Sequence, residues 1–250
     1  MRLISVSLFL VMIAMATAAD PLGHSRQCVV VVAPAWNSKT AVLRAFERTR
    51  PDSNWKMRGT AVPVVLGKNG LGWGRGVIDA KINDGPRKIE GDNRAPAGIF
   101  RLGPAFGYAP AQRAHWIKLR YLPFTSDTEG IDDPRSRFYN QLVNRSKVAQ
   151  VDWRTSERML RADDLYKWGV VVAHNPAATP GAGSCIFLHI WKNPSTATTG
   201  CTAMAERDLV KLLRWLDPNA HPILAQMPRR DYAMLQSSYE LPAIHEKPAR

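Results

Sequence analysis

The hydrophobic residues of this 250-residue chain are concentrated in short runs that are rich in β-branched side chains. The clearest runs are residues 27–33 (QCVVVVA), 60–66 (TAVPVVL), 168–174 (WGVVVAH) and 184–191 (SCIFLHIW). Runs of this length and composition are typical of buried strands, because a buried helix needs at least ten to twelve residues. The chain is therefore expected to fold mainly as β-structure.

Weaker patterns predict the other elements. Residues 115–121 (HWIKLRY) alternate like a half-buried strand, and residues 221–227 (HPILAQM) suggest one more. Residues 91–103 (GDNRAPAGIFRLG) begin with turn residues and pass into a strand. Residues 124–160 are polar and irregular, which predicts long loops with short helical pieces.

Two segments have helical periodicity. Four leucines recur at helical spacing before an Asp-Pro pair, which predicts a helix over residues 202–216. Residues 38–49 (SKTAVLRAFERT) have the pattern of a second amphipathic helix, with Ser38 as its N-cap. The predicted fold class is mainly β with α, that is, α+β.

The first 19 residues have the three parts of a secretory signal peptide. Arg2 precedes an apolar core, and Ala16-Thr17-Ala18 forms a small-residue cleavage pattern. We therefore expect export to the periplasm or cell wall, with a single domain over residues 20–250. An uncleaved N-terminal anchor is the alternative. Since no later segment has eighteen uninterrupted apolar residues, the mature chain is expected to be peripheral to a membrane at most.

The formal net charge of +13 limits the classes of partner. In a cytosolic protein such a charge would suggest nucleic acid. For an exported protein, the available polyanions are cell-wall carboxylates, anionic wall polymers and lipid head groups, so no nucleic-acid partner is expected. Because the lysines and arginines are dispersed rather than gathered into an arm, a generally solvated basic surface is the simpler interpretation.

The segment HIWKNPSTATTGCTAM, residues 189–204, contains a candidate base and a candidate nucleophile. His189 ends a predicted strand, and Cys201 precedes the predicted helix, whose N-terminus would favour a thiolate. Gly200 permits an unusual backbone angle, and the N–H groups at Thr199, Gly200 and Cys201 are candidates for an oxyanion hole. The alternative is a buried structural cysteine and a histidine that only hydrogen-bonds within the core.

The chain has three cysteines, Cys28, Cys185 and Cys201. An odd number in an exported protein suggests one disulfide and one free thiol. Four strand residues, about 13 Å, separate Cys185 from His189. A disulfide requires Cα atoms within about 7 Å, so a Cys201 in contact with His189 cannot bridge to Cys185. The expected pair is therefore Cys28 with Cys185, leaving Cys201 free.

The segment GDNRAPAGIFRL, followed much later by a strand histidine and by Thr-Gly-Cys, resembles the L,D-transpeptidases of the YkuD catalytic domain. The likeness covers roughly residues 61–216. It implies a compact β-sandwich domain with a helix after the catalytic cysteine. It also implies Cys201 as nucleophile and His189 as base, with the imidazole oriented by a carbonyl such as that of Ile190.

The reaction implied by this resemblance is acyl transfer on peptidoglycan stem peptides. The thiol would attack the carbonyl of the L-centred third residue, release the terminal D-amino acid, and pass the acyl group to an amine. The family uses no metal or organic cofactor, and carbapenems acylate its cysteine.

The chain departs from the family pattern close to the cysteine. Many members have Ser-His-Gly-Cys-x-Arg, whereas this chain has threonine at 199 and alanine at 203. Arg207 is a candidate replacement cation one helical turn beyond Ala203; an ordinary solvated residue is the alternative. His174 and Trp191 are candidates for lining a substrate cleft, although His174-Asn175 could equally form a turn. Asp132 and Asp133 are interpreted as a solvated turn.

Three rival functions remain open at this stage. An L,D-carboxypeptidase would use the same thioester with water as acceptor. A non-catalytic cell-wall-binding module would use only the basic surface. A zinc peptidase or amidase is disfavoured because the histidines, at positions 24, 115, 174, 189, 221 and 245, include no close ligand pair, and no metal site is expected.

Overall fold

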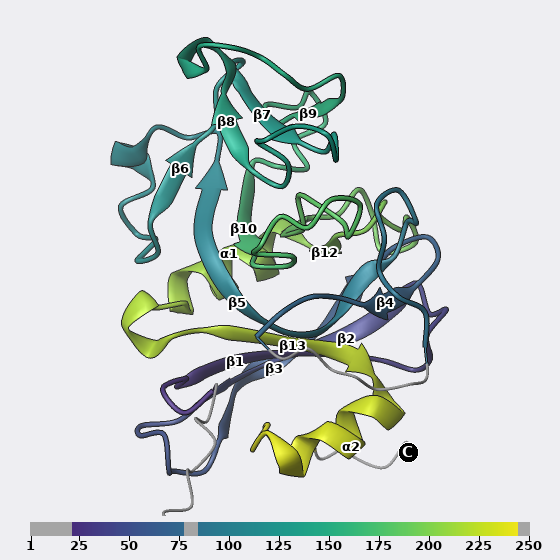
Figure 1. Ribbon diagram of the computed structural model, residues 1–250. Helices are drawn as coiled ribbons and strands as arrows, with labels where there is room; N and C mark the ends of the chain where they lie inside the picture. The colour runs from purple at the N-terminus through teal and green to yellow at the C-terminus, as the bar shows by residue number, and fades with distance from the viewer. Residues whose placement is uncertain (1–21, 78–84, 245–250) are drawn as a thin grey trace, which may run out of the picture.

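The computed structural model describes residues 22–77 and 85–244 (Figure 1). The expected signal peptide lies outside these residues. The described chain is mostly β, with two short α-helices, α1 (Glu206–Trp215) and α2 (Arg229–Ser238). Single 3₁₀ turns lie at Ala111–Arg113, Arg145–Lys147 and Pro218–Ala220. The predicted α+β class is confirmed.

The main sheet closes on itself in a β-barrel-like arrangement, because β5 pairs with both β13 and β10. In order around the sheet, the strands are β10 (Trp168–Val172), β11 (Phe187–Ile190), β12 (Thr202–Met204), β3 (Lys56–Val65), β2 (Thr40–Glu47), β1 (Gln27–Ala33), β13 (Ile223–Pro228) and β5 (Ala95–Gly107). Two short strands, β4 (Leu71–Trp73) and β6 (Tyr121–Pro123), also pair with β5.

A second, three-stranded sheet lies at the top of the molecule in Figure 1. It consists of β7 (Thr128–Ile131), β8 (Leu142–Asn144) and β9 (Ser156–Arg158). Loops with short helical pieces were predicted here. The strands escaped detection because each has only three or four residues, too few to show an alternating pattern.

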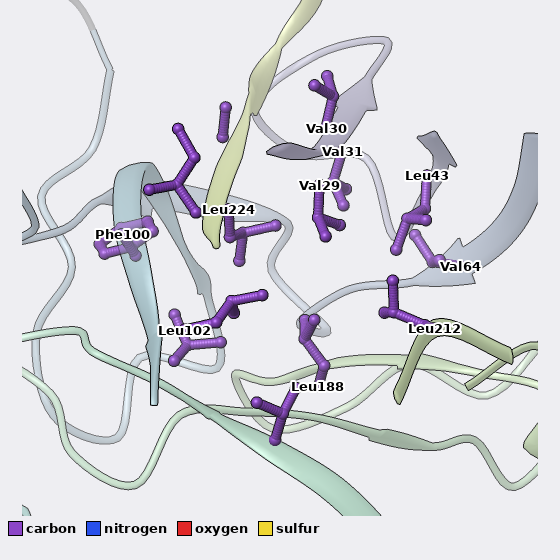
Figure 2. Close-up of a cluster of buried hydrophobic side chains, with 14 of the residues drawn as sticks. Val29, Val30, Val31, Leu43, Val64, Phe100, Leu102, Leu188, Leu212 and Leu224 are labelled. Carbon is purple, nitrogen blue, oxygen red and sulfur yellow. The ribbon is translucent and has the colours of Figure 1, made fainter. Parts of the chain in front are cut away.

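The largest hydrophobic cluster lies within the closed sheet (Figure 2), and the valines of β1 belong to it. β1 is buried along its whole length because β2 and β13 pair with its two edges and α2 packs against it. A strand covered on both faces is continuously hydrophobic, which explains the run QCVVVVA. On the other side of the molecule, α1 packs against β10 and β11.

Strands were correctly predicted in five of these places. The predictions over residues 27–33, 60–66, 168–174, 184–191 and 221–227 overlap β1, β3, β10, β11 and β13. The turn and strand predicted from residue 91 are also present, because β5 follows the turn at Gly91. These segments were predictable because each is a short, strongly apolar run.

The helix predicted over residues 38–49 is wrong, since this segment forms β2. Ala41, Leu43 and Phe46 point into the core, but the register with β3 shifts between Leu43 and Ala45. This irregularity breaks the two-residue alternation that would identify a strand. Pairing with β1 on one edge and β3 on the other then overrides the helical propensity of the segment.

Two other element predictions need correction. The helix predicted over residues 202–216 begins only at Glu206, because residues 202–204 form β12 beside β11. The strand predicted over residues 115–121 is absent except for its last residue, which begins β6. The preceding residues turn instead, with the Ile117 N–H donating to the Ala114 carbonyl.

Candidate active site

Cys201 lies at the bend between a surface loop and β12, and its residue is 7% exposed. Its sulfur accepts a hydrogen bond from the Phe187 N–H at 3.4 Å and donates one to the Cys185 carbonyl at 3.7 Å. Both partners belong to the segment that enters β11. The thiol is therefore held against the neighbouring strand rather than pointing into solvent.

The loop before Cys201 is fixed by Thr198. Its backbone exchanges hydrogen bonds with Leu66 and Lys68. Its hydroxyl donates to the Cys201 carbonyl at 2.6 Å and accepts from the Gly200 N–H at 3.1 Å. The Gly200 N–H, expected as an oxyanion donor, is thus already occupied in this conformation.

Gly200 has a φ of +153°, a conformation that residues with a side chain rarely adopt. A Cβ at this position would also lie 3.2 Å from the Arg94 carbonyl oxygen. The glycine before the cysteine is therefore required both by the backbone angle and by the close approach of residue 94.

The expected effect of a helix N-terminus on Cys201 is not present, because α1 begins five residues later, at Glu206. Burial raises the pKa of the Cys201 thiol to about 12, and the Glu157 carboxylate adds to the rise. The Phe187 N–H and the cations Lys88 and Arg161 act in the opposite direction without offsetting it. The resting group is a thiol.

His189 lies in β11, directly opposite Ala203 of β12. Its Nδ1 is 2.8 Å from the Ile190 carbonyl, which assigns the proton to Nδ1, and the backbone of Leu165 also hydrogen-bonds to the ring. Burial lowers the pKa of the imidazole to about 4, which keeps the ring neutral. The carbonyl of Ile190 therefore orients the ring as expected.

Cys201 and His189 face the same side of the closed sheet. The Tyr166 ring packs edge-on against His189 at 5.1 Å between ring centroids and against Phe187 at 5.6 Å. Tyr166, Phe187 and Cys201 belong to one buried cluster, separate from the core inside the sheet. No hydrogen bond joins Sγ to the imidazole in the described part of the chain. The two groups share a face without being in hydrogen-bond contact.

Cys201 opens onto a cavity of about 390 Å³, which we term the Cys201 pocket. One wall comes from residues 184–186 and 199–201, beside the closed sheet. The rest of the lining comes from the three-stranded sheet and its flanks and from the turn before β5. The lining residues outside the first wall are Lys88, Glu90, Gly91, Asn93, Asp132, Ser156, Glu157 and Tyr166. His189 is not among them.

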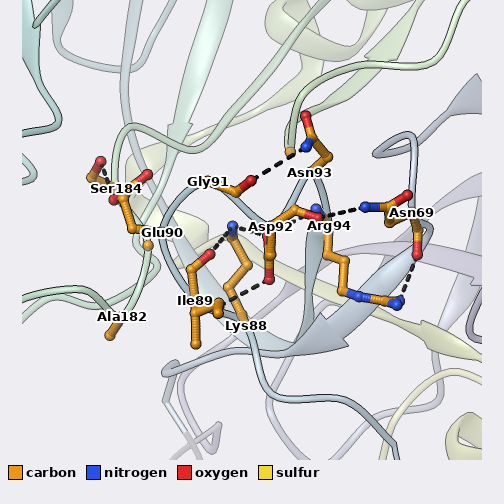
Figure 3. A network of polar contacts seen from close by, with 12 residues as sticks. Asn69, Lys88, Ile89, Glu90, Gly91, Asp92, Asn93, Arg94, Ala182 and Ser184 are labelled. Atoms are coloured by element: carbon orange, nitrogen blue, oxygen red, sulfur yellow. Dashed lines mark hydrogen bonds and ion pairs between the residues drawn. The ribbon is translucent and has the colours of Figure 1, made fainter.

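The turn that precedes β5 supplies the cation of the pocket (Figure 3). The Nζ of Lys88 is 2.5 Å from an Asp92 carboxylate oxygen and donates to the Ile89 carbonyl at 2.8 Å. Asp92 also accepts the N–H groups of Ile89 and Arg94. The Lys88 side chain is only 3% exposed, and its Nζ would lie 3.9 Å from a Cβ on Gly200. Within GDNRAPAGIF, Asp92 thus holds Lys88 beside the cysteine loop.

His174 does not line the Cys201 pocket. Its Nδ1 accepts the Arg75 N–H at 3.3 Å, and its Nε2 donates to the Ala182 carbonyl at 2.9 Å. Burial lowers its pKa to about 4. The adjoining Asn175 bonds to Thr179 and to the Gly183 carbonyl. The pair therefore organises the loop that leads to Cys185, which corresponds to the turn alternative.

Trp191 and Arg207 also lie away from the pocket wall. Trp191 is half-buried, and its N–H bonds to the Met204 carbonyl at 2.9 Å. The Arg207 side chain is 83% exposed and lies 3.5 Å from Asp208. Because Ala203 is in β12 and not in α1, the expected one-turn relation between positions 203 and 207 does not exist.

The predicted disulfide between Cys28 and Cys185 is wrong, since all three cysteines are free. Cys28 lies in the middle of the main core, where β1 pairs with Phe46 and Ile223. Cys185 instead packs against the cluster that contains Cys201, with its sulfur 3.8 Å from the Ile131 carbonyl. The expectation that Cys201 is free is confirmed.

Several residues of the pocket were missed from sequence. Asp132, interpreted as part of a solvated turn, lines the pocket, and Asp133 is buried against Arg135 and the Arg154 N–H. Glu157 comes from a strand too short to detect. The only available signal was the pairing of acidic and basic residues in IDDPRSR, which does not show which carboxylate points inward.

Comparisons with protein-family models, with curated proteins and with solved structures find no match for this chain. Among the helices of residues 22–77 and 85–244, none is long and apolar enough to cross a bilayer. The same residues contain no group of three or more His, Cys, Asp or Glu side chains arranged to hold a metal ion.

Proposed function

We propose that this protein is an exported cysteine acyltransferase that acts on peptidoglycan stem peptides, with the activity and fold of an L,D-transpeptidase. The observation that carries the proposal is the pairing of a pocket-lining thiol, Cys201, with a neutral imidazole on the same face of the adjoining strand. The resemblance of GDNRAPAGIF and Thr-Gly-Cys to that family supplies the substrate class.

In the proposed acylation, Nε2 of His189 takes the proton of Cys201 as Sγ attacks the carbonyl of the third stem residue. The thiol must first leave the Cys185 carbonyl and rotate towards the imidazole. The oxyanion then forms next to the Cys201 N–H. When the C–N bond breaks, the imidazolium protonates the departing D-amino acid and a thioester remains.

The thiol and the imidazole are both in the protonation states from which this sequence of steps starts, and the substrate has to bring their widely separated pKa values closer together. A thiol with a pKa near 12 is not ionised at pH 7, so it needs a base during attack. A histidine that is unprotonated at pH 7 can accept that proton. The carbonyl of Ile190 keeps Nδ1 protonated and so presents Nε2 as the base.

Defined muropeptides test the proposal. Wild-type protein should convert tetrapeptide stems into cross-linked dimers, and a carbapenem should add covalently to Cys201. Cys201→Ala should lose both reactions, and His189→Gln should slow both at least a hundredfold. Mass spectrometry of products and of intact protein measures these outcomes.

The other outcomes identify the rival functions. Shortened monomers without dimers would show an L,D-carboxypeptidase, in which water takes the acyl group. Binding to peptidoglycan without any covalent adduct would show a non-catalytic wall-binding module. Unchanged dimer formation by Cys201→Ala would overturn the proposal.

A further inference from the structure

The charge of the Cys201 pocket is opposite to that of the whole protein. The chain has a net charge of +13, yet three carboxylates line the pocket, from Glu90, Asp132 and Glu157. The cation Lys88 is already paired with Asp92 at 2.5 Å. A pocket of this composition attracts a positively charged group.

The three carboxylates differ in the number of hydrogen bonds that they accept from the protein. One Glu90 oxygen accepts the hydroxyls of Tyr139 and Ser184. One Glu157 oxygen accepts the Tyr166 hydroxyl at 2.8 Å and Arg161 at 3.2 Å. In the described chain, Oδ1 of Asp132 is shut off from solvent and has no hydrogen-bond partner.

A buried carboxylate oxygen without a donor is unfavourable, so such an atom in a reactive pocket indicates a missing donor. Asp132 immediately follows Ile131 of β7, which pairs with Ser156 of β9, and Glu157 is the next residue of that strand. The two carboxylates therefore come from adjoining strands. They line the same pocket as Cys201.

We propose that Asp132 and Glu157 form the subsite for the acceptor amine. The Asp132 side chain turns towards the incoming ammonium group so that Oδ1, buried without a donor in the resting state, accepts a hydrogen bond from it, and Glu157 takes one of its protons. This inference rests on the proposed acyltransferase function and assigns residues to its second half-reaction. It also defines the acceptor as a molecule with a primary ammonium group rather than water.

The electrostatics of the two carboxylates fit these roles. Burial raises the pKa of Glu157, and the negative charge of Asp132 raises it further. The charge of Glu157 in turn contributes to the raised pKa of Cys201. Glu157 therefore interacts electrostatically with both Asp132 and the cysteine, and its basicity is increased for accepting a proton.

The step balances as follows. The ammonium group gives one proton to the Glu157 carboxylate and becomes a neutral amine. Its nitrogen attacks the thioester carbonyl, a C–N bond forms and the C–S bond breaks. The second proton of the nitrogen passes through His189 to the departing sulfur. The products are an amide, the Cys201 thiol and a protonated Glu157, which releases its proton to solvent.

Two isosteric variants test the subsite, Asp132→Asn and Glu157→Gln. Asp132→Asn should form the carbapenem adduct at Cys201 within about threefold of the wild-type rate, because acylation does not involve the acceptor. Glu157→Gln should form the adduct no more slowly than wild type, because loss of the Glu157 charge lowers the pKa of the Cys201 thiol. Asp132→Asn should raise the KM for an amine-bearing stem peptide at least tenfold. Glu157→Gln should lower the rate of transfer at least tenfold and move its optimum to higher pH, where the amine is already deprotonated. The control is Asp52→Asn, which removes an exposed carboxylate far from the pocket.

A competition experiment needs no variant. In wild-type protein, a stem peptide with a free side-chain amine should compete with the acceptor at least ten times better than the same peptide acetylated on that amine. Equal competition, or an unchanged acceptor KM in Asp132→Asn, would overturn the amine subsite. An equal loss of carbapenem acylation and of transfer in both variants would also overturn the amine subsite, because the carboxylates would then act on the cysteine. If wild-type protein forms neither adduct nor dimers, the proposed function itself fails.

Discussion

At the scale of single residues, the environment of Cys201 opposes ionisation. The sulfur is buried, lies near the Glu157 carboxylate and hydrogen-bonds to a carbonyl. A thiol of this kind is protected from adventitious alkylation and oxidation, because the thiolate is the reactive species. In the proposed function, the reactivity of Cys201 depends on a substrate that fills the pocket and on His189 as the base.

The pH dependence of alkylation tests this interpretation. With a pKa of about 12, the thiolate fraction of Cys201 should increase about tenfold per pH unit between pH 7 and pH 9. Peptide-resolved mass spectrometry after iodoacetamide treatment should show the same increase in rate at Cys201. A thiolate at a helix N-terminus would give a nearly constant rate, which would contradict the observed surroundings. The urea-unfolded protein is the control for intrinsic reactivity.

Gly200→Ala is expected to destabilise the protein and to misplace the nucleophile. The positive φ of +153° is strained for alanine, and the new methyl group would lie 3.2 Å from the Arg94 carbonyl oxygen. Together these effects should lower the free energy of unfolding by about 1–3 kcal/mol. Gly181→Ala is the matched control, since Gly181 also has positive φ but nothing within 4 Å of its Cβ position. Urea unfolding should show the larger loss for Gly200→Ala, together with slower carbapenem acylation.

At the scale of elements, the turn before β5 links the sequence motif to the site. Residues 91–94 contact Lys88 and the chain near residue 70, and they place the start of β5. Lys88 and Arg94 both approach Gly200, so this turn lies against the loop that carries Cys201.

Removal of the Asp92 carboxylate should lower the free energy of unfolding. Asp92→Asn leaves the Lys88 ammonium buried without its counter-charge, and breaking a buried pair costs about 3–5 kcal/mol. The double variant Lys88→Met with Asp92→Asn should be more stable than Asp92→Asn alone, because no unpaired charge remains. Urea unfolding at pH 7 measures both. Similar stability of Asp92→Asn and the exposed Asp52→Asn would show that the pair contributes little.

The elements near Cys201 show when a sequence pattern predicts a strand or helix correctly. β11 and α1 were identified because one is a compact apolar run and the other has leucines at helical spacing. β12 and β9 were missed because three residues have no readable period. β2 was misread because a register shift disrupts its alternation. Local pattern predicts an element only when the element is long and regular enough to have one.

At the scale of the whole molecule, the closed sheet and the three-stranded sheet meet around the Cys201 pocket. The segment that leads into β12 supplies the thiol, and β9 and the residue after β7 supply Glu157 and Asp132, whereas His189 does not line the pocket. Two histidines, His174 and His189, are buried, and burial keeps each of them neutral.

These histidines make global stability depend on pH. Their folded-state pKa values of about 4 are below the usual 6.5, so the unfolded chain binds more protons than the folded chain as pH falls. Stability is therefore fully present above pH 6.5 and is lost between pH 6.5 and pH 4, by about 3 kcal/mol for each histidine. Urea unfolding at half-unit pH intervals should show this decline. His174→Gln should reduce its slope by about half, and an unchanged slope would exclude His174 as a source.

The sequence by itself determined the mainly β composition, most strands of the closed sheet, and the presence of a histidine and a cysteine in one segment. Each of these depends on residues that are neighbours along the chain. Only the tertiary structure decided the environment of the thiol, the free state of all three cysteines and the acidic wall of the pocket. The charges that act on Cys201 come from residues such as Glu157 and Lys88, 44 and 113 positions away, and its hydrogen bonds come from Phe187 and Cys185 in the segment that enters the neighbouring strand; no local pattern encodes such contacts.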